Sequence, residues 1–413
     1  MIKLTTIGWG NGQSNLLDAF YDNFWNEVEI TSIVSMSDDW RTTWELMWAF
    51  KDELGLHLPP PGDLRRCLFS LSGSKYRDYF KLVFEYIFLN EESIQNFTVL
   101  ELFRQVNREL LFFWRAWDLK EELKKFVELE SWDLYSMLKN EYGNILDFKL
   151  PLTRGLKWHK FWNILMASLY YNFEKNKVNP KGRESTLGWY DTMIHFMHNL
   201  LDVRGNVIPV TTKRARIRAI LWNWDIIESQ DRISNVAEYS AGIADLELAD
   251  CSTWASHDTQ VHESIVWADY ILVWPWDLFT SIISNFIIWW VKESLQESNA
   301  KIIYIWNSTN KWWETMWLTQ VDFINKIERF LGKRIDYFIL NDKKPILSEE
   351  EKIAFKNDIS VKGWDFLFLS PGEKSELIRR KIEVIEADLL DNHSFYKHNK
   401  QKISKIILDI INN

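Results

Sequence analysis

Glycine and cysteine are both scarce in this chain. It has 15 Gly in 413 residues, well below the roughly 7% that is usual. The two cysteines, Cys67 and Cys251, lie far apart in the sequence. This small number excludes a disulfide framework and favours a reducing compartment.

Long apolar runs and an excess of positive charge are also missing. No stretch of about 18 residues is free of charge and apolar, and the closest, Ile282–Val291, is too short to cross a bilayer. The N-terminus lacks the apolar run and cleavage site of a signal peptide. The net charge of −9 argues against nucleic acid as a partner. We therefore expect a cytoplasmic protein without a membrane span.

Tryptophan, by contrast, is abundant, with 24 residues, and it stands inside turns. The segments Gly8-Trp9-Gly10-Asn11-Gly12-Gln13-Ser14 and Trp274-Pro275-Trp276-Asp277 are examples. A turn that holds phosphate needs residues without a Cβ, because its N–H groups face an anion at close range. We therefore hypothesise that many of these tryptophans are glycines in the cell, encoded by UGA codons. The alternative is a Trp-rich protein that binds sugars by stacking.

Apolar, β-branched runs alternate with helical segments along the chain. Residues 2–7, a glycine turn, a helix from Ser14 to about Phe24 and a strand over Glu29–Met36 predict a βαβ unit. Further strands are predicted at residues 206–212, 270–273, 301–305, 337–340 and 383–387. The fold class that follows is α/β, with a Rossmann-like, mostly parallel sheet flanked by helices.

We expect a single domain over residues 1–413 that carries a helical insertion or cap at residues 75–150. Residues 343–370 are interpreted as a surface excursion. Residues 215–221 and 225–228 predict a hairpin around Trp222-Asn223-Trp224, and a glycine at position 224 would make this a strong turn.

The first candidate site is the turn between the first strand and the first helix. Its backbone could hold a phosphate at the positive end of the helix through the residues Gly8, Gly10, Asn11, Gly12 and Ser14. The spacing does not match the dinucleotide fingerprint, so NAD is not favoured. Asp38 and Asp39 follow the next strand and could bind a divalent cation such as Mg²⁺, a ribose hydroxyl, or only cap a helix.

Two further motifs each lie at a turn that enters a predicted helix. Asp63 and Arg65 follow a proline-rich turn, where Asp could bind metal or cap the helix and Arg could bind phosphate or pair with the acids. His159 and Asn163 lie four residues apart and share a helical face. No cluster has the spacing of a zinc site, and nothing indicates haem.

Two more loops follow predicted parallel strands. One carries Thr280 and Ser281 at a helix start, and the other carries Glu314 and Thr315. Because parallel strands end at the same edge of a sheet, these loops should meet the first glycine turn. The sequence predicts a site for a nucleotide-linked small molecule there.

These motifs together resemble one family. It contains the bacterial gluconeogenesis factor (YvcK-like) and the phospholactate transferase of deazaflavin-coenzyme synthesis (CofD-like). The segments Gly8–Ser14, Asp38–Trp44 and Pro60–Leu68 are similar to the motifs Gly-Gly-Gly-Thr-Gly-x-Ser, Asp-Asp-Gly-Gly-Ser-Ser-Gly and Leu-Pro-Pro-Gly-Asp-Ile-Arg-Asn-Cys-Leu of the YvcK-like branch. Tryptophan stands at a family glycine at positions Trp9, Trp40, Trp44, Trp158, Trp162, Trp274, Trp276 and Trp313.

For the YvcK-like branch, the resemblance implies binding of a nucleotide sugar such as UDP-N-acetylglucosamine and a role in gluconeogenesis, cell-envelope synthesis and cell shape. For the CofD-like branch, it implies an enzyme, a Mg²⁺-dependent transferase that uses a nucleotide-diphosphate-linked donor. In that case Asp38, Asp39 and Asp63 would be the catalytic acids. The YvcK-like interpretation is favoured, and whether the protein forms a homo-oligomer is left open.

Overall fold

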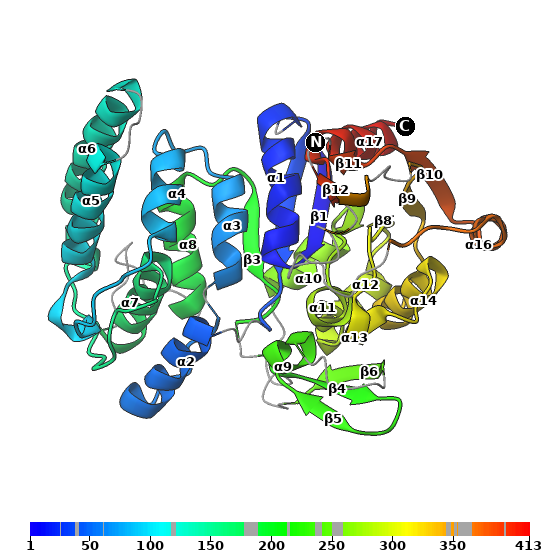
Figure 1. Cartoon of the computed structure of the whole chain (residues 1–413), viewed down its shortest axis with the longest axis horizontal. Helices are drawn as coiled ribbons and strands as arrows, with labels where there is room; N and C mark the ends of the chain where they lie inside the picture. Colours follow the sequence, from blue (N-terminus) through cyan, green and yellow to red (C-terminus); the bar gives the residue numbers. More distant parts are fainter. Residues whose placement is uncertain are drawn as a thin grey trace. The chain divides into compact units, whose positions relative to one another are not determined.

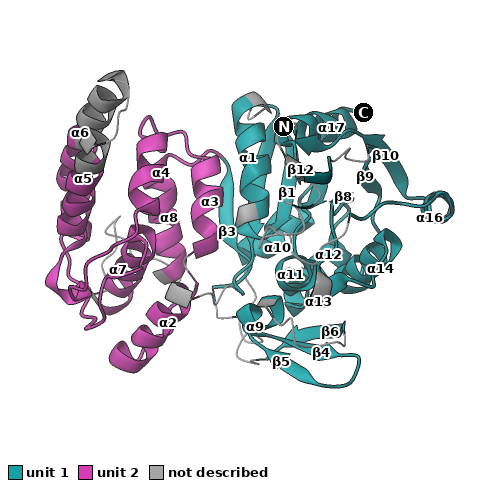
Figure 2. Cartoon of the chain, in the orientation of Figure 1, with its two compact units in different colours: residues 1–39, 205–413 teal, residues 40–204 magenta. Residues whose placement is uncertain are grey.

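A computed structural model describes most of the chain. The described residues are 1–24, 26–37, 41–60, 62–116, 121–176, 189–212, 215–235, 242–249, 259–343, 348–350, 353, 366–391 and 394–413. They form two compact units, residues 1–39 with 205–413 (unit 1) and residues 40–204 (unit 2), shown in two colours in Figure 2.

Unit 1 is built on a seven-stranded sheet in the order β10-β9-β8-β7-β1-β2-β3. Every neighbouring pair in this sheet is parallel. The strands are β1 (Ile2–Gly8), β2 (Val28–Val34), β3 (Asn206–Pro209), β7 (Tyr270–Val273), β8 (Lys301–Ile305), β9 (Tyr337–Asn341) and β10 (Glu383–Ala387). The predicted α/β class with a parallel sheet is confirmed.

Helices flank this sheet, as Figure 1 shows. They are α1 (Gly10–Phe24), α10 (Thr259–Val266), the π-helix η3 (Leu278–Ile283), α11 (Ser284–Phe286), α12 (Trp289–Glu297), α13 (Trp312–Thr315), α14 (Gln320–Leu331), α16 (Pro371–Arg379) and α17 (Lys400–Asn412). The central strands are buried on both faces by these helices: Ile271, Leu272 and Val273 of β7 have no exposed surface. The strands of this sheet are therefore continuous apolar runs, such as Tyr-Ile-Leu-Val. They lack the alternation of apolar and polar residues that is typical of a strand with one exposed face. A further helix, α9 (Gln230–Asn235), contacts strands β4 (Ile217–Leu221) and β5 (Ile226–Glu228) of a second, smaller sheet.

The predicted hairpin is confirmed and belongs to a small second sheet of unit 1. β4 (Ile217–Leu221) pairs antiparallel with β5 (Ile226–Glu228), and on its other side with β6 (Ile243–Leu248), which the sequence did not predict. A further antiparallel pair joins β11 (Leu390–Asp391) to β12 (Ser394–His398).

Unit 2 is helical. Its elements are α2 (Arg41–Leu54), α3 (Gly62–Ser70), α4 (Arg77–Glu85), the short 3₁₀ turn η1 (Ile94–Asn96), α5 (Val99–Ala116), α6 (Glu121–Leu146), α7 (Phe161–Asn176) and α8 (Trp189–Leu201). An aromatic core holds α3, α4 and α7 together, in which the buried ring of Trp162 packs against Phe69 and Phe84 with ring centroids 5.8 and 5.5 Å away. The helices expected at residues 75–150 are part of this larger unit. No helix in the described part of the chain is long and apolar enough to span a membrane.

Candidate functional site

The strand order of unit 1 reverses between β1 and β7. From β1 the chain proceeds to β2 and β3 on one side, whereas β7 leads to β8, β9 and β10 on the other. In open parallel sheets the crevice beyond the carboxyl ends of the strands at such a switch point is where ligands bind. The loops after β1 and β7 are two of the loops that the sequence singled out.

The loop after β1 is shorter than the sequence suggested. α1 begins at Gly10 and not near Ser14, so Gly10 and Gly12 lie in its first turn and only Trp9 separates strand from helix. The first turn of a helix directs its N–H groups and its positive dipole end outward. Ser14 is buried, and the side chain of Asn11 lies outside the described part of the structure.

Gln13 fixes this first turn to the sheet. Its side chain is fully buried and accepts hydrogen bonds from the hydroxyls of Thr6 (2.5 Å) and Ser32 (3.0 Å). Its amide donates to the Ile33 carbonyl at 2.9 Å. A buried amide needs such partners. The sequence gives no signal for this role, because a single Gln in a glycine turn carries no pattern.

Trp274 and Trp276 lie against the first turn of α1. A Cβ built on Gly12 would come within 2.5 Å of Trp274 Cδ1 and 3.4 Å of Trp276 Cε3, so the indole of Trp274 leaves no room for any side chain there. Trp274 is buried, with 4% of its surface exposed, whereas Trp276 is 42% exposed. Trp274 also meets the imidazole of His398 edge-on, with ring centroids 5.9 Å apart.

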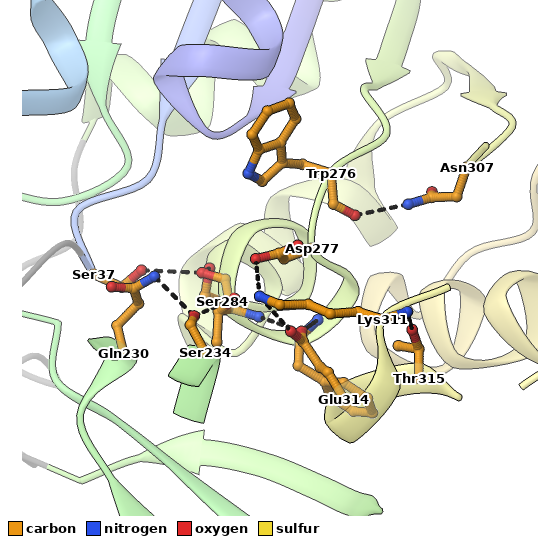
Figure 3. A network of polar contacts seen from close by, with 12 residues as sticks. Ser37, Gln230, Ser234, Trp276, Asp277, Ser284, Asn307, Lys311, Glu314 and Thr315 are labelled. Carbon is orange, nitrogen blue, oxygen red and sulfur yellow. Dashed lines mark hydrogen bonds and ion pairs between the residues drawn. The ribbon is translucent and has the colours of Figure 1, made fainter. Parts of the chain in front are cut away.

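The loop after β7 leads into η3, where Thr280 and Ser281 lie fully buried. Glu314 closes the start of this helix, because its Oε1 accepts hydrogen bonds from the backbone N–H groups of Phe279 (2.9 Å) and Thr280 (3.4 Å). Thr315 lies beside it and accepts from the Lys311 N–H at 2.8 Å. The predicted loops after β7 and β8 therefore meet, as Figure 3 shows for the labelled residues.

A buried charge cluster joins the two loops. Lys311 Nζ lies 2.6 Å from Asp277 Oδ2 and 3.4 Å from Glu314 Oε2. Burial raises the pKa of Glu314 to about 7, and the Lys311 ammonium opposes this rise only in part. Burial would lower the pKa of Lys311, but the carboxylates of Asp277 and Glu314 outweigh it and raise that pKa. Asp277 and Lys311 were not singled out in the sequence, since one acid and one base 34 residues apart show no spacing signal.

Four serines gather at the carboxyl ends of β2 and β7. Ser35 Oγ lies 3.0 Å from Ser37 Oγ and 3.4 Å from Ser284 Oγ. Ser37 donates to the Thr280 carbonyl (3.3 Å), and Ser234 donates to the Thr280 hydroxyl (3.3 Å). Thr280 has no exposed surface, so these contacts place its hydroxyl inside a polar network. Figure 3 shows the serines Ser37, Ser234 and Ser284 of this network. For Ser35 and Ser37, their position directly after a predicted parallel strand is the signal by which the sequence could have identified them.

Asp63 and Arg65 lie in unit 2, in α3, and both are buried. Arg65 Nε is 2.8 Å from Glu85 Oε1 on α4, and Lys160 also pairs with that carboxylate. Burial would raise the pKa of Glu85, but the charges of Arg65 and Lys160 overcome this effect and lower it. Glu85 is not one of the acids that the sequence singled out, and binding of phosphate by Arg65 stays a prediction.

His159 and Asn163 also lie in unit 2, and both are buried. Asn163 lies in the first turn of α7, but His159 precedes this helix, so the prediction that the two share a helical face is wrong. Burial lowers the pKa of His159 to about 4, so the ring is neutral at pH 7. Its Nε2 lies 4.0 Å from Glu45 Oε2. The Asn163 Oδ1 atom and the His159 Nδ1 atom have no hydrogen-bond partner among the described residues.

The paired acids Asp38 and Asp39, the predicted metal ligands, lie outside the described residues. Within the described part of the chain, no three His, Cys, Asp or Glu side chains are grouped so that they could hold a metal ion. Magnesium at Asp38 and Asp39 stays a prediction.

Comparisons with known proteins cover nearly the whole chain. A protein from Thermotoga maritima named "Putative gluconeogenesis factor" is 23% identical over 409 residues, which are 98% of each chain. A protein of the same name from Aquifex aeolicus is 20% identical and spans 100% of this chain and 97% of its own. A crystal structure of a UPF0052 family member from Bacillus halodurans superimposes with a TM-score of 0.68 at 19% identity, covering 99% of both chains, and thus shares the fold. The family model of the 2-phospho-L-lactate transferase CofD matches residues 4–390, and the chain belongs to this family.

Proposed function

We propose that unit 1 binds a nucleotide sugar of the UDP-N-acetylglucosamine type at the switch point between β1 and β7. One observation carries the proposal: the first turn of α1 and the loop after β7 lie against each other there, with Gly12 at the contact. A helix start preceded by glycine suits a diphosphate, because its N–H groups and its dipole face the anion.

The polar network at the same edge of the sheet supports the same proposal. Glu314 and Lys311 hold the start of η3, and the serines after β2 fix the neighbouring loop. Rigid loops of this kind position a ligand without movement on binding. Thr280 is held within this network by Ser37 and Ser234.

The names of the relatives suggest the biological role. They are called gluconeogenesis factors, and we propose that this chain likewise links carbon metabolism to cell-envelope synthesis by sensing a nucleotide sugar. A sensor binds its ligand without consuming it.

A transferase is the second candidate, because the matching family model is named after one. In that case Asp38 and Asp39 would hold Mg²⁺ at the same edge of the sheet, where the cation would neutralise charge on a diphosphate-linked donor. Release of the nucleotide from such a donor in the presence of Mg²⁺ distinguishes this function from sensing.

The test is calorimetric titration of UDP-N-acetylglucosamine into protein with glycine at the eight positions given above. Saturable binding that a Gly12→Asp variant of the same protein lacks is the expected result, because this carboxylate would repel the diphosphate. A well-folded protein that does not bind the sugar nucleotide, or that binds it equally well with Asp at position 12, would overturn the proposal.

A further inference from the structure

We propose that the functional protein carries glycine in place of Trp158, Trp224 and Trp274, and that the space filled by the Trp274 indole belongs to the ligand. The first part rests on the backbone and on packing alone. The second part rests on the function proposed above.

The backbone of Trp158 and Trp224 is left-handed. Their φ angles are 70° and 69°, close to the 64° and 67° of Gly55 and Gly332. A Cβ in this region collides with the following carbonyl, and a left-handed backbone in a bulky residue is an outlier. Glycine adopts it without strain.

Hydrogen bonds hold the two segments in which these residues lie. The Trp158 N–H donates to the Phe88 carbonyl at 2.8 Å. Trp224 is the last residue of a three-residue hairpin loop, closed by the bond from the Leu221 N–H to the Asp225 carbonyl (2.9 Å). Glycine is the residue that such a loop requires at its left-handed position.

Packing does not compensate for the strain. Trp158 is 60% exposed and Trp224 is 84% exposed, although tryptophan is on average highly buried. The other non-glycine residues with positive φ in the described structure are Asp202, Ser229 and Lys381, which are smaller or more flexible. Nine of the large apolar side chains exposed in the described structure are tryptophans: Trp44, Trp48, Trp132, Trp158, Trp222, Trp224, Trp267, Trp276 and Trp317. A UGA codon that is read as glycine in the cell, but translated here as Trp, gives this pattern.

Trp274 adds a third, different observation. Its buried indole contacts both Gly12, in the first turn of α1, and the ring of His398, which itself meets Trp306 with centroids 5.8 Å apart. Without the indole, a slot bounded by Gly12 and His398 opens at the switch point of the sheet. The positive end of α1 on one wall and a flat imidazole on the other suit an anionic group joined to a ring or sugar.

Mass spectrometry of the protein from its source organism tests the glycine assignment directly. Peptides that span positions 158, 224 and 274 are expected to have the mass of glycine at each. Tryptophan at these positions would overturn the assignment, whatever the ligand proves to be.

Urea unfolding of the recombinant chain tests the backbone argument. At positions 158 and 224, the Trp→Gly variant should have a folding equilibrium constant about five-fold larger than the Trp→Ala variant, because only alanine keeps the Cβ. The matched control is Trp132, which is 67% exposed in α6, where alanine should be the more stable of the two. If the glycine variant is the more stable of the two at all three positions, or the alanine variant is at all three, the argument is contradicted.

Titration with UDP-N-acetylglucosamine tests the slot. The protein with all eight Trp→Gly substitutions should bind at least ten-fold more tightly than the protein with seven of them that retains Trp274. Equal affinity would overturn the slot. If glycine is found in the peptides but neither protein binds, the proposed function and the slot fail while the glycine assignment stands.

Discussion

Replacing Glu314 with glutamine should remove a loss of stability that the protein otherwise suffers as the pH rises from about 4.5 to about 7. Burial raises the pKa of this carboxyl from 4.5, its ordinary value, to about 7 in the folded chain. Between these two values the folded state binds more protons at this site than the unfolded state does. The contribution of this group to the free energy of unfolding is therefore greatest below pH 4.5 and decreases as the pH rises toward 7.

The size of the effect follows from the two pKa values. At about 1.4 kcal/mol for each pH unit between them, the carboxyl destabilises the folded protein by ~3 kcal/mol above pH 7 relative to pH 4. Glutamine keeps the oxygen that accepts from the Phe279 and Thr280 N–H groups and does not titrate. Lys311 also lies 2.6 Å from Asp277, and this contact should persist in the variant.

The measurement is the free energy of unfolding by urea at a series of pH values between 4 and 8, for the wild type and for Glu314→Gln. The difference between the two proteins should change by ~3 kcal/mol across this range, with other titrating groups cancelling. Glu263→Gln, at an exposed position on α10, is the control. Parallel pH profiles of the wild type and Glu314→Gln would refute the reasoning.

Three further predictions concern other described residues. Burial lowers the pKa of His159 from 6.5 to about 4, so the free energy of unfolding should fall by ~3 kcal/mol as the pH falls from 6.5 to 4. The His159→Gln variant should lose less over this pH range in the same urea experiment. An equal loss in the variant and the wild type would contradict this prediction. Gly12→Ala should lower the free energy of unfolding by about 1–3 kcal/mol, because its Cβ would lie 2.5 Å from the indole of Trp274. In a chain that also carries Trp274→Gly, this loss should largely vanish. Additive effects of the two substitutions in this double-mutant cycle would count against the contact. Glu85→Gln removes the carboxylate 2.8 Å from the buried Arg65 and should cost about 1–3 kcal/mol in urea unfolding, so a neutral result would mean that this pair does not stabilise α3.

The strands of unit 1 could be predicted because they are short apolar runs between polar turns. The bounds of β7, β8 and β10 match the predicted residues 270–273, 301–305 and 383–387. β6 was missed, since Ile-Ala-Asp-Leu-Glu-Leu is half exposed and its partner β4 lies more than 20 residues earlier in the chain. Its pairing is a tertiary effect, and local propensity is a weak guide to it.

The candidate site was predictable only in part for a similar reason. Each loop follows a strand, so the sequence could place Gly12, Thr280 and Glu314 at one edge of the sheet. What it could not show is that Thr280 is buried within a serine network, or that Lys311 bridges two acids from different loops. Such contacts depend on side-chain packing between segments that are distant in sequence. That the whole chain forms a single domain stays a prediction.

The sheet of unit 1 is assembled from both ends of the chain, and this has a consequence during synthesis. β1 and β2 leave the ribosome first, but β7, which pairs with β1, follows only after the 165 residues of unit 2 and the hairpin of β4 and β5. The helices of unit 2, with their local contacts, can form while the apolar edge of β1 still lacks its neighbour. The nascent chain thus carries an unpaired strand edge for most of its translation, and chaperone binding or aggregation should concentrate on residues 2–8 in that interval.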